Sequence, residues 1–130
     1  MVSVPSIRRL LEVKRLGPVT LVRCQVPILF EADLVDRIGK QLLSLADRTG
    51  QSLVFNLGMV HVMASAMVGK LIALHRKLKE GGKQLVLCHL QQHLYEKIFE
   101  VHRLSQLFRL CPSEQDALNA HLSSEPEDQP

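Results

Sequence analysis

The chain has 130 residues, of which 46% are hydrophobic and 4% aromatic, and its formal net charge is +3. This length suits one globular domain, and the composition excludes a disulfide-stapled or a disordered chain. Because aromatic residues are scarce and tryptophan is absent, base-stacking surfaces for single-stranded nucleic acids are not expected. The basic residues are scattered, and their densest group is best explained as a solvated strand edge, so we expect no nucleic-acid partner; that group is Arg8, Arg9, Lys14 and Arg15.

The cysteines and the apolar runs indicate the compartment. Cys24, Cys88 and Cys111 are widely separated, and no C-x-x-C pair occurs. Cys24 and Cys88 lie in apolar, strand-like runs, so we expect buried, reduced thiols in an intracellular protein. No apolar run is long enough to cross a bilayer, and no signal-peptide core is present. We therefore expect a cytoplasmic protein without membrane insertion.

The first part of the chain predicts a hairpin followed by a helix. Residues 10–15 and 19–25 are two β-like runs on either side of Gly17-Pro18, which is turn chemistry. Thr49-Gly50 marks the end of a helix that starts near Glu31. Its apolar residues recur on one helical face, at Leu34, Ile38, Leu42 and Leu45.

The middle of the chain alternates between strand and helix patterns. Residues 53–57 and 85–88 are short apolar runs, as expected for strands buried on both faces. Between them a helix is predicted, which Gly81-Gly82 ends. Its apolar face consists of Met67, Leu71, Leu74 and Leu78.

The last part predicts a third amphipathic helix, a short edge strand and a final helix. The third helix carries Leu94, Ile98 and Val101, and the edge strand covers residues 107–110. Ser113 and Asp116 resemble a capping box at the start of the final helix. We expect residues 1–122 to form a single domain, with a loose lead-in at residues 1–7, and residues 123–130 to form a disordered acidic tail. The predicted fold class is α/β: a small mixed β-sheet, with an opening hairpin and then mostly parallel strands, flanked by about four helices.

Motifs of catalysis and of cofactor binding are absent from the sequence. There is no nucleotide-binding fingerprint, P-loop, nucleophile elbow or zinc-type spacing, and no two carboxylates share an apolar stretch. His89 and His93 are four residues apart, but His89 ends a strand, so they do not share a helix face. Three further histidines, His61, His75 and His102, are expected to be ordinary surface or half-buried residues. We expect no enzyme activity, no metal and no cofactor.

Ser65 lies where the chain turns from strand to helix, and its position allows two interpretations. Its hydroxyl can cap the helix that follows, which would contribute about 1 kcal/mol. It can also accept a phosphate, because a helix start tolerates the added charge of about −1.5 to −2. Such a charge would change any partner surface laid over the site without disturbing the core.

The run from residue 53 to 71, an apolar strand followed by Gly-Met-Val-His-Val-Met-Ala-Ser-Ala-Met-Val-Gly-Lys-Leu, resembles the central segment of STAS domains, the anti-sigma factor antagonist family. Gly81-Gly82 with the strand at 85–88 resembles the next turn and strand of that family. Residues 104–118, with Phe108 and Pro112-Ser113-Glu114, resemble its closing segment. The resemblance extends over residues 10–122. It implies a non-enzymatic domain that binds a protein partner, in many members a serine kinase that is also an anti-sigma factor.

In this resemblance Ser65 matches the phosphoacceptor, but its neighbours depart from the family pattern of Asp-Ser-Ser/Thr-Gly. Ala64 stands in place of the Asp, Ala66 in place of the second Ser/Thr, and Met67 in place of the Gly. The acidic residue that the family carries after the second strand is also replaced, by an apolar loop at residues 26–29. Loss of the carboxylate removes a contact for a kinase, and methionine hinders close approach to the backbone.

If the two loops are neighbours, as in the family, they form an apolar partner-binding surface beside Ser65. The predicted surface comprises Ile28, Leu29, Phe30, Glu31, His61, Met63, Ala64, Ala66, Met67 and Lys70. Several of these, Met63 and Phe30 above all, can instead point into the core. The first functional hypothesis is an anti-sigma factor antagonist whose switch is Ser65. The alternative is a constitutive scaffold or transporter-associated subunit that is never phosphorylated, and the apolar loops also allow a homodimer.

Overall fold

The computed structural model describes residues 10–122, and the predictions for residues 1–7 and for the tail at 123–130 lie outside them. No helix within 10–122 combines the length and the apolar character that crossing a bilayer requires. The helices and strands, in chain order, are β1 (Leu11–Leu16), β2 (Val19–Cys24), β3 (Ile28–Leu29), α1 (Ala32–Thr49), β4 (Ser52–Asn56), β5 (Val62–Met63), α2 (Ser65–Glu80), β6 (Leu85–Cys88), α3 (Gln92–Leu94), β7 (Arg109–Cys111) and α4 (Glu114–Leu122).

The main sheet has five strands in the order β1-β2-β4-β6-β7. β1 and β2 form the opening antiparallel hairpin, and Gly17 in its turn has a φ of 64°, which favours glycine. All other neighbours in this sheet are parallel. The predicted fold class is therefore confirmed, and the carboxyl ends of the parallel strands meet at one edge of the sheet.

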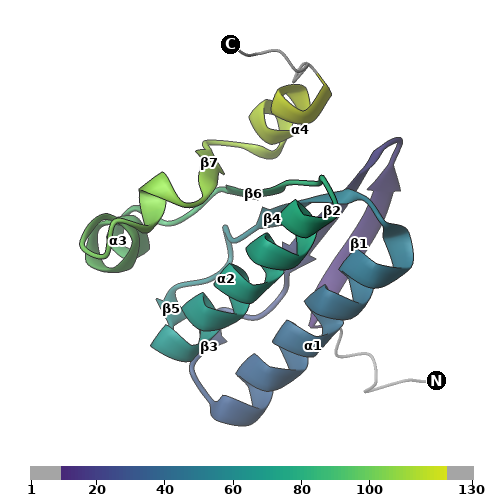
Figure 1. The fold of residues 1–130 in the computed structure, drawn as a ribbon. Helices are drawn as coiled ribbons and strands as arrows, with labels where there is room; N and C mark the ends of the chain where they lie inside the picture. The colour runs from purple at the N-terminus through teal and green to yellow at the C-terminus, as the bar shows by residue number, and fades with distance from the viewer. Residues whose placement is uncertain (1–9, 123–130) are drawn as a thin grey trace, which may run out of the picture.

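Helices cover both faces of the sheet, as Figure 1 shows. α1 and α2 lie side by side over one face, where the large core contains Phe55 and the fully buried face of α2, including Met67. α4 packs against the other face, over β4, β6 and β7. The central strands need apolar residues at consecutive positions because both of their faces are covered. This explains the unbroken runs Leu53-Val54-Phe55 and Leu85-Val86-Leu87-Cys88, all of which are buried.

The region between β6 and β7 differs from the single amphipathic helix that the periodicity predicts. One turn of α3 continues as a π-helix, Tyr95–Glu100, and after Arg103, with a φ of 58°, a 3-10 turn follows at Leu104–Gln106. The wider π turn directs Phe99 into the core, where its ring lies 6.0 Å from that of Phe108. Val101, expected on the apolar face, is 66% exposed instead.

The last strand and the last helix are close to their predicted positions. The edge strand covers Arg109–Cys111, which is slightly later than predicted. The predicted cap of the final helix is confirmed, because the Asp116 N–H donates to Ser113 Oγ at 3.1 Å and Ser113 Oγ donates back to the Asp116 carboxylate at 2.9 Å. All three cysteines are unpaired; Cys24 and Cys88 are buried, and burial raises the pKa of Cys88 to about 12.

Candidate functional site

The two predicted loops lie side by side, joined by a second small sheet that the sequence did not reveal. β3 pairs in parallel with β5, with Ile28 opposite Val62 and Leu29 opposite Met63. Backbone bonds extend the pairing at its far end, since the Ala64 N–H donates to the Leu29 carbonyl at 2.8 Å. Each strand has two residues, too few for a recognisable alternation. In Figure 1 this small sheet lies beside the start of α2.

The pleat of this small sheet divides the loop residues between core and solvent. Leu29 is completely buried and Met63 is 7% exposed. Ile28, Phe30 and Val62 are 54%, 65% and 41% exposed, on the alternate positions. We call these three residues the apolar patch. Large apolar side chains exposed together on a small domain are typical of interaction surfaces.

Ser65 is the first residue of α2 and its side chain is exposed. The helix begins one residue earlier than the cap interpretation assumed, so that Ala64, which cannot cap with its side chain, occupies the N-cap position. The Met67 N–H donates to the Ala64 carbonyl at 2.9 Å, and the Ser65 hydroxyl has no hydrogen bond within residues 10–122. The interpretation of Ser65 as the cap of the helix is therefore wrong, and its side chain is exposed to solvent.

Four of the predicted partner-binding residues are placed differently from the prediction. Leu29, Met63 and Met67 are buried, so their side chains pack in the core and not on a partner. Lys70 lies between the two helices, where its Nζ pairs with the Asp36 carboxylate at 2.9 Å. Its stem covers Gly39, at which a Cβ would come within 2.7 Å of Lys70 Cδ. Of the other predicted residues, those that are exposed are Ile28, Phe30, Glu31, His61 and Ala66, and Ala64 is half-buried.

A groove of about 430 Å³ opens beside Ser65. One wall comes from the start of α2 and the loop before it, with Met63, Ser65 and Val68. The other wall comes from the irregular segment 95–106, with Lys97, Ile98, His102 and Leu104. Sequence reasoning did not associate Lys97 or His102 with Ser65, because their approach depends on the π and 3-10 turns.

His61 connects the small sheet to α3. The ring of His61 stacks on that of His93, with centroids 6.4 Å apart and planes 10° apart. The His93 Nε2 lies 2.7 Å from the His61 carbonyl oxygen. His89 contacts the start of α4 instead, where its Nε2 accepts a hydrogen bond from the Glu114 N–H at 3.3 Å. Among residues 10–122, no three His, Cys, Asp or Glu side chains are placed to hold one metal ion.

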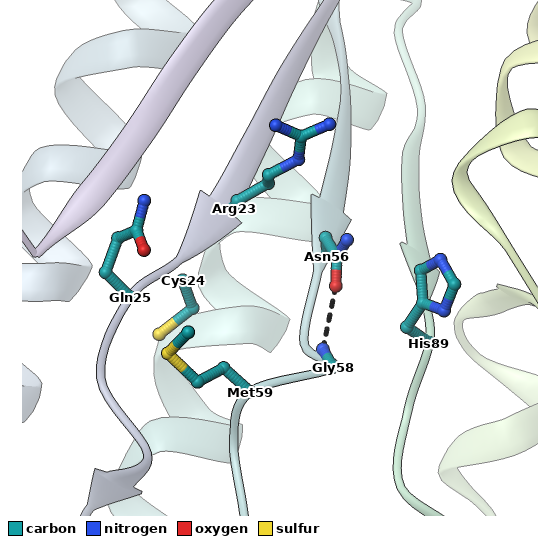
Figure 2. Close-up of a pocket in the computed structure, with 7 residues that line it drawn as sticks. All are labelled: Arg23, Cys24, Gln25, Asn56, Gly58, Met59 and His89. Carbon is teal, nitrogen blue, oxygen red and sulfur yellow. Dashed lines mark hydrogen bonds between the residues drawn. The ribbon is translucent and has the colours of Figure 1, made fainter.

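A second pocket, of about 390 Å³, lies at the carboxyl ends of β2, β4 and β6. Figure 2 shows Arg23, Asn56 and His89 around it, together with the bond from the Gly58 N–H to Asn56 Oδ1, 2.7 Å long. This edge is where open α/β sheets usually bind ligands. A Cβ at Gly58 would lie 3.1 Å from both Asn56 Oδ1 and His89 Cβ, so the close approach of these loops favours glycine.

The polar groups at this edge already bind one another. Arg23 donates twice to Glu114, from Nε at 2.7 Å and from a terminal nitrogen at 2.8 Å, and also to Glu12 at 3.3 Å. Asn56 donates its amide to Glu114 at 2.5 Å. The bonds from Arg23 are the main cause that lowers the pKa of Glu114 to about 2. The network thus attaches the start of α4 to the sheet and leaves little for a ligand to bind.

The comparisons with known proteins agree with this architecture. The sequence profile of the STAS domain matches residues 11–117. No match was found among curated proteins. Among solved structures, this chain is similar to an anti-sigma-factor antagonist (STAS) domain protein from Planctomyces limnophilus, with 19% identity, a TM-score of 0.75, and coverage of 87% of this chain and 98% of that one.

Two other similar structures differ in kind. One is the Bacillus cell fate determinant SpoIIAA in its phosphorylated form, with 17% identity, a TM-score of 0.63, and coverage of 85% of this chain and 98% of that one. The other is the murine anion transporter Slc26a9, with 18% identity and a TM-score of 0.65, where the match covers 85% of this chain but 19% of the transporter. At these identities the similarity establishes the fold.

Proposed function

This chain belongs to the STAS domain family, and on that premise we propose that it is a non-enzymatic regulator of the anti-sigma factor antagonist type, switched by phosphorylation of Ser65. The observation that carries the proposal is an exposed serine hydroxyl, free of hydrogen bonds within residues 10–122, next to an exposed apolar patch. The partner would be a protein that is both an anti-sigma factor and a serine kinase. Its apolar surface would cover Ile28, Phe30 and Val62.

The geometry makes the switch local. Ser65 follows β5 by two residues, and the Ala64 backbone between them is bonded to Leu29 of β3. Transfer of the γ-phosphoryl group of ATP to Ser65 Oγ would release ADP and the hydroxyl proton. The product carries about −1.5 to −2 charges at pH 7 beside the apolar patch. A partner that covers the patch would have to desolvate this charge, so we expect phosphorylation to release it. A phosphorylated form of one similar antagonist is consistent with this chemistry.

Ser65→Asp is expected to weaken partner binding about tenfold or more, which corresponds to about 1.4 kcal/mol, because it places a charge at the interface. Ser65→Ala should bind like the parent chain and should abolish the mass gain of one phosphate on incubation with the partner kinase and ATP. Isothermal titration calorimetry and intact-mass spectrometry measure the two effects. Ser44→Asp, at an exposed serine of α1, is the matched control and should change neither. Equal affinity of the Ser65→Asp and Ser44→Asp chains would contradict the proposed switch.

Phe30→Ala is expected to weaken partner binding about tenfold or more while it leaves the stability of the domain almost unchanged. The side chain is 65% exposed, so its removal costs the fold little, whereas aromatic anchors carry much of the energy of an interface. Titration calorimetry and thermal unfolding of the same sample separate the two effects. Val13→Ala, on the distant strand β1 and 39% exposed, is the control and should bind normally. Normal binding by Phe30→Ala would show that the partner covers another surface.

The second candidate function is a constitutive scaffold or transporter-associated module that is not phosphorylated. It is favoured by Ala64 and Met67, which replace residues of the family's phosphorylation motif, and by the similarity to a domain within an anion transporter. A homodimer formed through the same apolar patch is a variant of this function. A stable complex without any phosphate gain at Ser65 would support it over the switch.

A further inference from the structure

The groove beside Ser65 has two basic side chains on the wall that faces the serine. Lys97 and His102 both line it and both are exposed. Within residues 10–122 neither side chain has a hydrogen bond or an ion pair. By contrast, Lys70 forms an ion pair with Asp36, and Lys77 forms one with Asp47. The groove therefore presents donors that its own walls do not satisfy.

Apart from Ser65 and the two basic residues, the groove is lined by apolar side chains. Met63 is buried, and Val68, Ile98 and Leu104 are half-buried in its two walls. The nearest carboxylates along the chain are those of Glu96, which directly precedes Lys97 and accepts a hydrogen bond from Gln92, and of Glu100; both are exposed, and within residues 10–122 neither forms an ion pair with Lys97.

The backbone that carries Lys97 and His102 is irregular. Lys97 lies in the π-helical turn, and His102 directly precedes Arg103, a non-glycine residue with a φ of 58°. π turns inside helices are frequent at functional sites, because they re-aim side chains that a regular helix would direct elsewhere. Here the irregular turn places both basic residues along one groove, with Ser65 on its opposite wall.

Building on the proposed phosphorylation of Ser65, we propose that Lys97 and His102 bind the phosphoryl group that this serine carries. A lysine ammonium has three donors, a histidine ring can donate from either nitrogen, and a phosphoryl group offers three acceptor oxygens. The modified serine would then join the start of α2 to segment 95–106 across the groove. Phosphorylation would therefore affect both the start of α2 and segment 95–106, and not only the charge at Ser65.

The test uses the 130-residue chain with phosphoserine installed at position 65 by genetic incorporation, so that no kinase is required. A ³¹P NMR titration measures the second pKa of the phosphoserine, which is about 6 when no cation lies beside it. We expect this pKa to be lower than 6 in the parent chain, since a nearby cation favours the dianion. The Lys97→Met substitution should raise this pKa by about 0.5 or more. His102→Gln should raise it less, and Lys97→Arg should preserve the parent value.

Lys79→Met is the matched control, because Lys79 is exposed in the last turn of α2, at the opposite end from Ser65. It should leave the phosphoserine titration unchanged. The same phosphoserine titration in the parent, Lys97→Met and Lys79→Met chains would overturn the inference. That result would not bear on whether Ser65 is phosphorylated by a partner, which the kinase assay decides separately.

Discussion

Replacing Met67 with lysine is expected to lower the free energy of unfolding of the domain by several kcal/mol. Met67 is completely buried in the core between the sheet and the helices. A lysine there must bury an unpaired ammonium group, lose its proton to become neutral, or open the packing to reach water, and each of these costs several kcal/mol. Because domains of this kind are stable by about 5–15 kcal/mol, such a cost removes much of their stability. Urea unfolding followed by circular dichroism measures the loss.

Two further variants make this prediction specific to burial. Met67→Ala should lower the free energy of unfolding by about 2–5 kcal/mol, as removal of a buried methionine side chain leaves a cavity. Ile28→Lys adds the same charge at an apolar residue that is 54% exposed, and it should change stability by about 0.5 kcal/mol or less. If Met67→Lys and Ile28→Lys had the same unfolding midpoint, Met67 could not be buried as the structure shows.

Glu114→Gln is expected to destabilise the domain at neutral pH and to have no effect in strong acid. The bonds from Arg23 hold the pKa of Glu114 at about 2, below its ordinary value of 4.5. A carboxylate whose pKa is lowered by folding stabilises the fold in full above about pH 4.5, and this contribution disappears as the pH falls to about 2. The whole shift would correspond to about 3 kcal/mol, but Arg23 is 35% exposed and solvent screens the pair, so we expect about 1–2 kcal/mol.

Thermal unfolding of the parent and Glu114→Gln chains between pH 7 and pH 2 tests this expectation. The difference in unfolding temperature should be constant above about pH 4.5 and should narrow below it. Asp47→Asn is the matched control, since Asp47 pairs with Lys77 but is 66% exposed, and such pairs contribute little. A difference between parent and Glu114→Gln that did not depend on pH would show that the effect comes from packing and not from the ion pair.

The candidate site was predictable in its outline. Ser65 could be identified because a polar residue between an apolar strand and an apolar helix has few roles, and the resemblance to STAS domains indicated the neighbouring loop. The individual side chains were less predictable. Met67 carries both signals, since its place in the apolar period of α2 predicts burial and its place after Ser65 predicts contact with a partner. The structure shows that the helical period decides, because that face of α2 packs on the sheet.

The sequence by itself determined the fold class, the order of the main elements and the cap at Ser113, because each depends on periodicity or on residues a few positions apart. Only the tertiary structure decided which loop residues are exposed, that Arg23, Asn56 and Glu114 meet, and that Lys97 and His102 share a groove with Ser65. Each of these features brings together residues that are distant along the chain. No local sequence pattern predicts them, because the residues come into contact only when the helices pack on the sheet.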